Sequence, residues 1–195
     1  MDSLTNLYQT STASCKIHIH PKWLTTDDLE EAITNEIKQK VEGNCNRDGY
    51  VKKGSVTMLK RSAGMASGNE TNGLVSFDVV YQVQICFPVA NQSMICKIKT
   101  SNKIGFHVIP CYEHGLEKLD EDENPLVIII PKQRVDPLIL PNLKENLFVL
   151  VRIIGSRFDL GDDKISVVGT ITHFGTTEKI LFASYAYATT AMDVS

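Results

Sequence analysis

The chain has 195 residues and a formal net charge of −3 at pH 7, from 20 lysine and arginine and 23 aspartate and glutamate residues. This balance excludes the basic footprint of a dedicated nucleic-acid-binding protein, so we expect any RNA contact to be weak and local. No apolar run reaches the roughly 20 residues that cross a bilayer, and Met1–Ser14 lacks the apolar centre of a signal peptide, so we expect no membrane partner.

The first elements are predicted from the spacing of apolar residues and from the proline and glycine residues that end them. Residues 1–13 show little pattern and predict a loose arm. Ser14–His20 alternates apolar and polar residues, which predicts a half-buried strand that Pro21 ends. Apolar residues at three- and four-residue spacing predict an amphipathic helix over about Asp27–Val41, closed by Gly43.

Two further strands complete an N-terminal domain. Tyr50–Lys60 predicts a strand with polar interruptions, and Leu74–Phe87 predicts one whose odd-numbered residues are all apolar and should face the helix. Between them, the Gly/Ser/Asn-rich segment Arg61–Gly73 predicts a long hairpin loop. The order strand–helix–strand–strand predicts an α+β domain over residues 1–88, with one helix on an antiparallel sheet.

After Pro88, short strands at regular spacing predict an all-β OB-fold barrel of Greek-key type over residues 89–175. Gly105 stands where a bulge or bend is expected. The Ala/Thr/Tyr-rich tail 176–195 leaves the choice open between an extra packed strand and a short helix. The five expected strands are Ser93–Lys99, Lys103–Ile109, Leu126–Ile130, Asn146–Gly155 and Lys164–Thr172.

No motif in the chain indicates catalysis or a bound metal. A GxSxG elbow, a Walker loop and paired carboxylates are all missing, so we predict no catalytic residue and no cofactor; an enzyme with an unrecognised site stays as a minor alternative. His18 and His20 share one strand face and could chelate a metal, but no third ligand is near, so we favour a solvent-facing pair. Five cysteines without a CxxC pair predict reduced thiols: Cys15, Cys45, Cys86, Cys96 and Cys111.

One surface of the barrel is a candidate for RNA. Lys97, Lys99 and Lys103 precede Phe106 and His107, and lysines can follow phosphates while aromatic rings stack on bases. The alternative is an ordinary solvated strand face, because a stacking platform usually carries more rings.

Several short pieces, in their order along the chain, resemble one known family. They are Ile19-His20-Pro21, Val41-Glu42-Gly43, Asp48-Gly49-Tyr50-Val51, the run Val75–Tyr81 with Phe87-Pro88, Ile104-Gly105-Phe106, and Lys164–Ile171. Together they resemble the S1-domain stalk subunit of multisubunit DNA-directed RNA polymerases, the family that includes the seventh subunit of polymerase II and its archaeal counterpart. The resemblance covers about Cys15 to Thr176.

The resemblance implies a non-catalytic subunit in which a tip domain docks on the polymerase core near the clamp and an S1-like barrel lies near the exiting transcript. The implied partners are the large polymerase subunits, a second stalk subunit and, weakly, nascent RNA. The residues implied near the core contact are Pro21, Lys22, Trp23, Gly43, Gly49, Tyr50, Gly64, Met65, Gly68 and Gly73.

The chain also departs from the family pattern. Asn91–Ile95 replaces the acidic-Gly step that opens the S1 barrel, and Val127–Pro131 lacks base-stacking rings. This divergence resembles that of polymerases encoded by large DNA viruses, which implies a host-cytoplasmic or virion location; a cellular protein of this family implies the nucleus. A free-standing OB-fold protein that binds single-stranded RNA is the alternative function.

Overall fold

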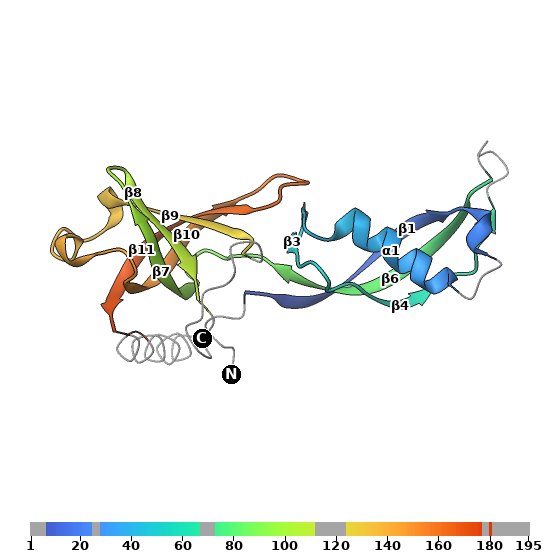
Figure 1. Ribbon diagram of the computed structural model, residues 1–195, viewed down its shortest axis with the longest axis horizontal. Coiled ribbons are helices and arrows are strands. Elements are labelled where there is room, and N and C mark those ends of the chain that lie inside the picture. Colours follow the sequence, from blue (N-terminus) through green and yellow to red (C-terminus); the bar gives the residue numbers. More distant parts are fainter. Residues whose placement is uncertain (1–6, 25–27, 67–72, 112–123, 177–179, 181–195) are drawn as a thin grey trace. The chain divides into compact units, whose positions relative to one another are not determined.

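The computed structural model describes residues 7–24, 28–66, 73–111, 124–176 and 180 (Figure 1). The chain divides into two compact units. Tyr8–Cys86 forms the helix-containing unit, and the chain from Phe87 onward, with Leu7, forms the barrel unit. Among the described residues, no helix combines the length and the apolar character needed to cross a membrane.

The helix-containing unit is built around one long central strand, β6 (Val75–Cys86). On one side β6 pairs with β1 over the full length of that strand, from Gln9 opposite Ile85 to Ile19 opposite Val75. On its other side β6 pairs in turn with β5, β4 and β3. Strand β2 pairs with β3, and all these pairs are antiparallel. The remaining elements are β1 (Gln9–Ile19), η1 (Pro21–Trp23), α1 (Leu29–Val41), β2 (Cys45–Asn46), β3 (Gly49–Val51), β4 (Thr57–Arg61) and β5 (Met65–Ala66).

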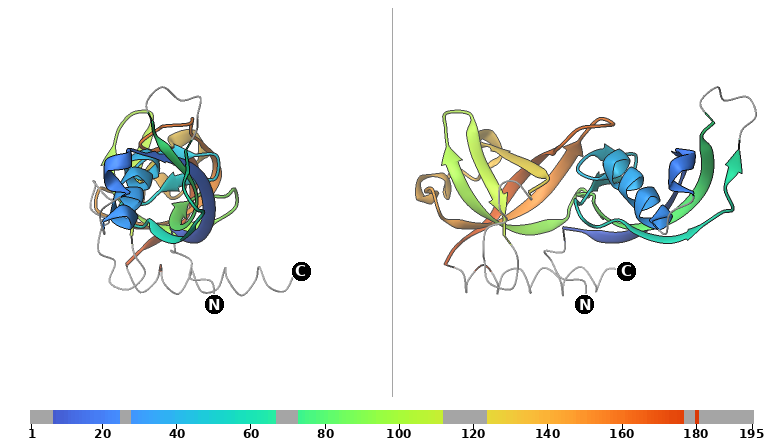
Figure 2. Two further views of the ribbon diagram at one scale, coloured as in Figure 1. Left: turned by 90° about the vertical axis from the view of Figure 1, so that its right-hand side faces the viewer. Right: turned by 45° about the vertical axis from the view of Figure 1, so that its right-hand side comes forward.

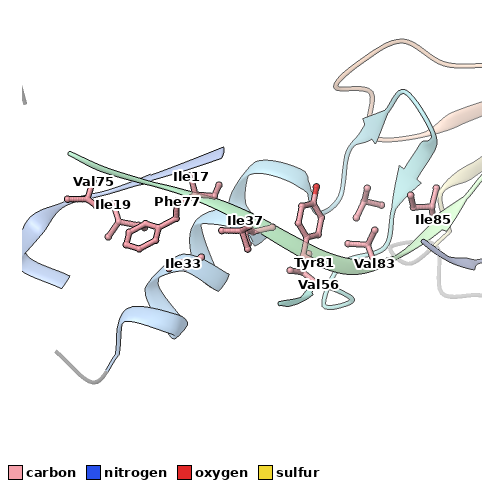
Figure 3. Close-up of a cluster of buried hydrophobic side chains, with 12 residues drawn as sticks. Ile17, Ile19, Ile33, Ile37, Val56, Val75, Phe77, Tyr81, Val83 and Ile85 are labelled. Carbon is pink, nitrogen blue, oxygen red and sulfur yellow. The ribbon is translucent and has the colours of Figure 1, made fainter. Parts of the chain in front are cut away.

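The core of this unit lies between α1 and one face of the sheet (Figure 3). Ile33 and Ile37 of α1 are fully buried, and Leu29 and Val41 pack partly against the same cluster, so the helix presents one stripe of four-residue spacing. The prediction that odd-numbered β6 residues face the helix is confirmed from Val75 to Ile85. Burial of each such side chain contributes roughly 1.5–3 kcal/mol before entropy is counted.

Three expectations for the N-terminal domain predicted over residues 1–88 were wrong. The strand expected at Ser14 begins at Gln9, because the serines and threonines before it pair with β6 although they carry no apolar alternation. The strand expected over Tyr50–Lys60 is divided into β3 and β4 by a turn in which Gly54 has φ 72°. Phe87 does not face the helix; it is 49% exposed and its ring meets that of Phe158 edge-on at 6.1 Å.

The barrel unit confirms the prediction of a closed five-stranded β-barrel of OB-like form (Figure 2). Its closed order is β10-β11-β9-β8-β7, in which β9 and β11 run parallel and the other pairs antiparallel. The strands are β7 (Ser93–Ser101), β8 (Gly105–Pro110), β9 (Leu126–Pro131), β10 (Phe148–Arg157) and β11 (Ile165–Gly175), with η2 (Lys132–Arg134) and η3 (Leu140–Asn142) before β10.

Two details of the barrel bear on expectations left by the sequence. Gly105 begins β8 and marks a close backbone approach rather than a bulge, since a Cβ there would meet the carbonyl group of Ile130. From the predicted tail, Ile180 is fully buried in an apolar cluster with Ile95 and Leu150, and its N–H donates to the carbonyl oxygen of Thr176 at 3.1 Å. The acidic segment Asp120–Glu123 and most of the tail lie outside the described residues.

Candidate functional site

The residues expected near a polymerase contact fall at opposite ends of β6 (Figure 1). At one end Val75 pairs with Ile19 of β1 and Ala66 of β5, and at the other end Cys86 pairs with Tyr50 of β3. The 12 residues of β6 separate these ends by roughly 36 Å at ~3.3 Å per residue. The expected residues therefore form two groups rather than one site.

The group at the Cys86 end is structural. Gly43 has φ 77°, and its N–H donates to the carbonyl oxygen of Val51 at 2.9 Å, which turns the chain from α1 into β3. Gly49 has φ 128°, and a Cβ at this position would overlap the carbonyl oxygen of Cys86. Tyr50 is 5% exposed. Burial and close packing give Gly43, Gly49 and Tyr50 a structural role in this unit, and their assignment to a binding surface stays a prediction.

The group at the Val75 end is exposed. Pro21 opens η1, where the Nδ1 atom of His20 accepts a hydrogen bond from the backbone N–H of Lys22 at 3.3 Å. The ammonium group of Lys22 lies 5.2 Å from the ring centroid of Trp23, a cation–π contact that orders both side chains. Trp23 is 38% exposed and the neighbouring Leu24 is 40% exposed, so the turn presents an aromatic and an aliphatic side chain to solvent.

Part of the expected hairpin loop pairs with the sheet at the same end. Met65 lies directly opposite Ser76, whose hydroxyl donates to the Met65 carbonyl oxygen at 3.1 Å, while the Met65 side chain is 60% exposed. Gly64 packs so closely on Val75 that a Cβ would lie 2.7 Å from its Cγ1 atom. Gly73 is exposed with φ 59°, and Gly68 lies outside the described residues.

We call Lys22, Trp23, Leu24 and Met65 the distal surface. Beside it, a groove of about 700 Å³ runs between the end of β1 and α1. One side of the groove is lined by His18, His20 and Lys22. The other side is lined by Asp28, Glu31 and Glu36. The apolar lining residues are Ile19, Trp23 and Leu74. Such a groove suits a polypeptide segment that carries one apolar side chain and a charged group. No set of three His, Cys, Asp or Glu residues in the described ranges is arranged to hold a metal ion.

The candidate RNA residues of the barrel do not form one surface. Phe106 is 2% exposed and its ring points into the barrel, with the Lys132 ammonium group 5.5 Å from its centroid. Phe106 and His107 are consecutive in β8, and successive strand residues point to opposite faces, so the two rings do not share one face. Lys97 is half-buried and lies 5.5 Å from the ring centroid of Phe148. Lys99 and Lys103 are exposed.

The outer face of β8 and β9, which commonly binds ligands in OB folds, is aliphatic here. His107 lies opposite Ile129, which lies opposite Val168 of the parallel strand β11. Ile129 and Val168 are 45% and 40% exposed. The turn between β10 and β11 adds three aspartates and one lysine in residues 159–164, which repel a phosphate backbone. Apart from the partly exposed imidazole of His107, these residues offer bases no ring on which to stack.

The buried thiols offer no nucleophile. Burial raises the pKa of the Cys86 thiol to about 12, with nearby Cys45 adding to the shift. Burial likewise holds the pKa of Cys96 well above its ordinary value, with Cys111 adding to the shift. Both thiols therefore stay protonated at neutral pH, whereas nucleophilic attack requires a thiolate.

Comparison with known proteins adds one finding. No protein-family model matches the chain. The chain is 22% identical over 188 residues to a protein of Acanthamoeba polyphaga mimivirus that is provisionally named a DNA-directed RNA polymerase subunit, across 90% of this chain and 87% of that one. The similarity supports an RNA polymerase subunit.

The sequence interpretation did not identify the acidic side of the groove. Asp28 at the N-cap of α1 and Glu31 and Asn35 within the helix recur at three- and four-residue spacing, so two carboxylates and an amide occupy one helix face. That spacing was present in the sequence, but only the packing of α1 beside the end of β1 places this face opposite His18 and His20. Leu24 was also omitted, because a single exposed leucine carries no pattern.

Proposed function

We propose that this chain is a non-catalytic stalk subunit of a DNA-dependent RNA polymerase, of the S1-domain type to which the seventh subunit of polymerase II and its archaeal counterpart belong. The observation that carries the proposal is the similarity to the mimivirus polymerase subunit over 90% of the chain. The helix-containing unit followed by a closed five-stranded barrel agrees with the tip and S1-like domains of that family.

In this proposal the distal surface docks on the polymerase core near the base of the clamp. Trp23 and Met65 are the side chains suited to this task, because an exposed aromatic ring and a pliant thioether bury large apolar area at small conformational cost. The groove beside them accepts a segment of the partner whose charge is matched by Glu31 or by Lys22. Binding to one arrangement of the clamp more tightly than to another shifts the clamp toward the first by mass action.

Once the distal surface has docked, the barrel is held near the exiting transcript, where it can contact RNA. Lys97, Lys99 and Lys103 remain the barrel cations proposed for transient contact with RNA, whereas Phe106 is not among the proposed contacts because its ring is buried. The large polymerase subunits are the proposed partners, with a second stalk subunit beside this one. The proposed compartment follows the enzyme, either the host cytoplasm or virion of a virus or the nucleus of a cell.

A free-standing OB-fold protein that binds single-stranded RNA is the second candidate. The closed order of the five strands favours it, since OB barrels commonly bind oligonucleotides. The aliphatic face formed by Ile129 and Val168 counts against it.

Affinity capture of the tagged full-length chain from the cells that express it distinguishes the two candidates. We expect mass spectrometry to identify the two large polymerase subunits among the captured proteins, in constant ratio to the bait. Capture of RNA without those subunits would contradict the proposed function and favour the second candidate.

A further inference from the structure

A second recess of the helix-containing unit has a chemistry that the distal surface lacks. It has a volume of about 330 Å³ and lies where the turn after β3 meets the ends of β1 and β6. Lys52 and Lys53 line it, together with Ser55, Thr57, Gln82 and Gln84. Gly54 forms the turn itself with φ 72°, and nothing lies within 4 Å of a Cβ placed there, so the turn is open to an approaching group.

The charge of the recess is positive. Its lining holds two lysines and no acidic residue. Within the described ranges, no carboxylate forms a salt bridge with Lys52 or Lys53. Glu42 also reaches this turn, where its Oε1 atom accepts the backbone N–H of Val56 at 3.0 Å, but it is not a lining residue.

Contacts within the unit hold both lysine side chains in place. The Lys52 ammonium group lies 5.0 Å from the ring centroid of Tyr8, a buried ring that fixes the direction of the side chain. The stem of Lys53 lies against Gly43, where a Cβ would come within 2.6 Å of the Lys53 Cε atom. A lysine ordered before binding loses less entropy when it meets an anion.

Uncharged groups complete the recess. The Ser55 hydroxyl donates to the Lys52 carbonyl oxygen at 2.6 Å and accepts the Gln84 N–H at 3.2 Å, so it holds the turn against β6. Thr57 lies directly opposite Gln82. The hydroxyl of Thr57 and the side-chain amides of Gln82 and Gln84 are of the kind that donates hydrogen bonds to phosphate oxygens beside the lysine ammonium groups.

We propose that this recess binds a backbone phosphate of single-stranded nucleic acid. Lysine ammonium groups bind phosphate as point charges, and the surrounding donors are uncharged and face no competing carboxylate in the lining. The site differs from the barrel lysines, which lie beside an aliphatic face. The inference stands apart from the proposed function, because a chain that never assembles with a polymerase would bind the same phosphate.

The test is a fluorescence-anisotropy titration of a labelled 12-nucleotide oligouridine with the full-length chain across salt concentrations. In the variant Lys52→Gln/Lys53→Gln we expect the slope of log affinity against log salt to become shallower by about 0.7, since the one phosphate contact that is lost contributes about 0.7 for single strands. The matched control is Lys38→Gln/Lys40→Gln on α1, which removes the same charge and should leave the slope unchanged. Lys52→Arg/Lys53→Arg should retain binding.

Two results would overturn the inference. One is equal loss in the Lys52/Lys53 variant and in the Lys38/Lys40 control, which would indicate an effect of net charge alone. The other is a set of amide shifts at Gly54 and Ser55 with inorganic phosphate, but none with the oligonucleotide, which would indicate a small-anion site. Thermal unfolding of each variant verifies that the chain remains folded.

Discussion

At the scale of single residues, the thiol of Cys86 couples stability to alkaline pH. Burial raises its folded-state pKa to about 12 from an ordinary 9.0. Between these values the unfolded chain loses the proton while the folded chain keeps it, so the free energy of unfolding must fall as pH rises through this window.

We therefore expect Cys86→Ala to reduce the pH dependence of stability between pH 9 and 10.5, even though the substitution lowers stability at pH 7. The measurement is urea unfolding followed by the fluorescence of Trp23, the single tryptophan, which lies in the same unit. Identical slopes for the variant and the original chain would show that Cys86 ionises normally.

Two glycines of the barrel provide a matched test of close packing. A Cβ at Gly169 would lie 2.6 Å from the Val151 Cγ1 atom and 3.0 Å from the Arg152 carbonyl oxygen, whereas nothing lies within 4 Å of one at Gly155. We expect Gly169→Ala to destabilise the barrel by about 1–3 kcal/mol and Gly155→Ala to change it by less than about 0.5 kcal/mol. Urea unfolding followed on barrel amide signals measures both; equal effects would contradict the packing described for β11.

At the scale of elements, the barrel depends on a residue from beyond its last strand. Ile180 fills an apolar cluster on the barrel with Ile95, Cys111 and Leu150 and has no exposed surface. We expect Ile180→Ala to cost roughly 2–5 kcal/mol of barrel stability, because the substitution leaves a cavity. Leu160→Ala, at a position 70% exposed in the β10–β11 turn, should be near neutral. Hydrogen exchange of peptides from β7 and β10 reports the difference, and an Ile180 variant with unchanged protection would refute the packing.

Elements with strong periodicity were predictable from the sequence, and elements without it were not. The helix and β6 were predicted because each buries one face. Burial of one face places apolar residues about four positions apart in a helix and two positions apart in a strand. The first half of β1 was missed because Gln9–Ala13 pairs through its backbone, which leaves no apolar pattern. Phe106 was expected on the surface because an aromatic residue follows three lysines, but the sequence does not state which face of β8 is buried, and its ring is 2% exposed.

The candidate site was predictable only in part for a related reason. A proline after a strand marked the turn at Pro21, and the family resemblance assigned Pro21–Trp23 to the contact. That Met65 lies at the same end of the sheet depends on the register of β5 and β1 against β6, which a sequence does not state. The family resemblance likewise assigned Gly43 and Gly49 to a contact surface, when close packing explains both glycines.

At the scale of the whole molecule, we propose a protein that acts by being held in place. In this proposal the distal surface is the attachment site, and loss of that site should separate the chain from its partner while both units remain folded. Met65→Asp is the direct change, because a carboxylate cannot enter an apolar contact without a large desolvation cost. Leu59→Asp is the matched control, since Leu59 is 52% exposed on the neighbouring strand β4, away from the distal surface.

The decisive experiment is quantitative affinity capture of RNA polymerase by the full-length chain, by Met65→Asp with Trp23→Ala, and by Leu59→Asp. We predict that the original chain and the control recover the large polymerase subunits equally, and that the distal double variant recovers about tenfold less or lower still. Undiminished recovery by a folded double variant would contradict docking through the distal surface, and failure of the original chain to recover polymerase would contradict the stalk assignment itself.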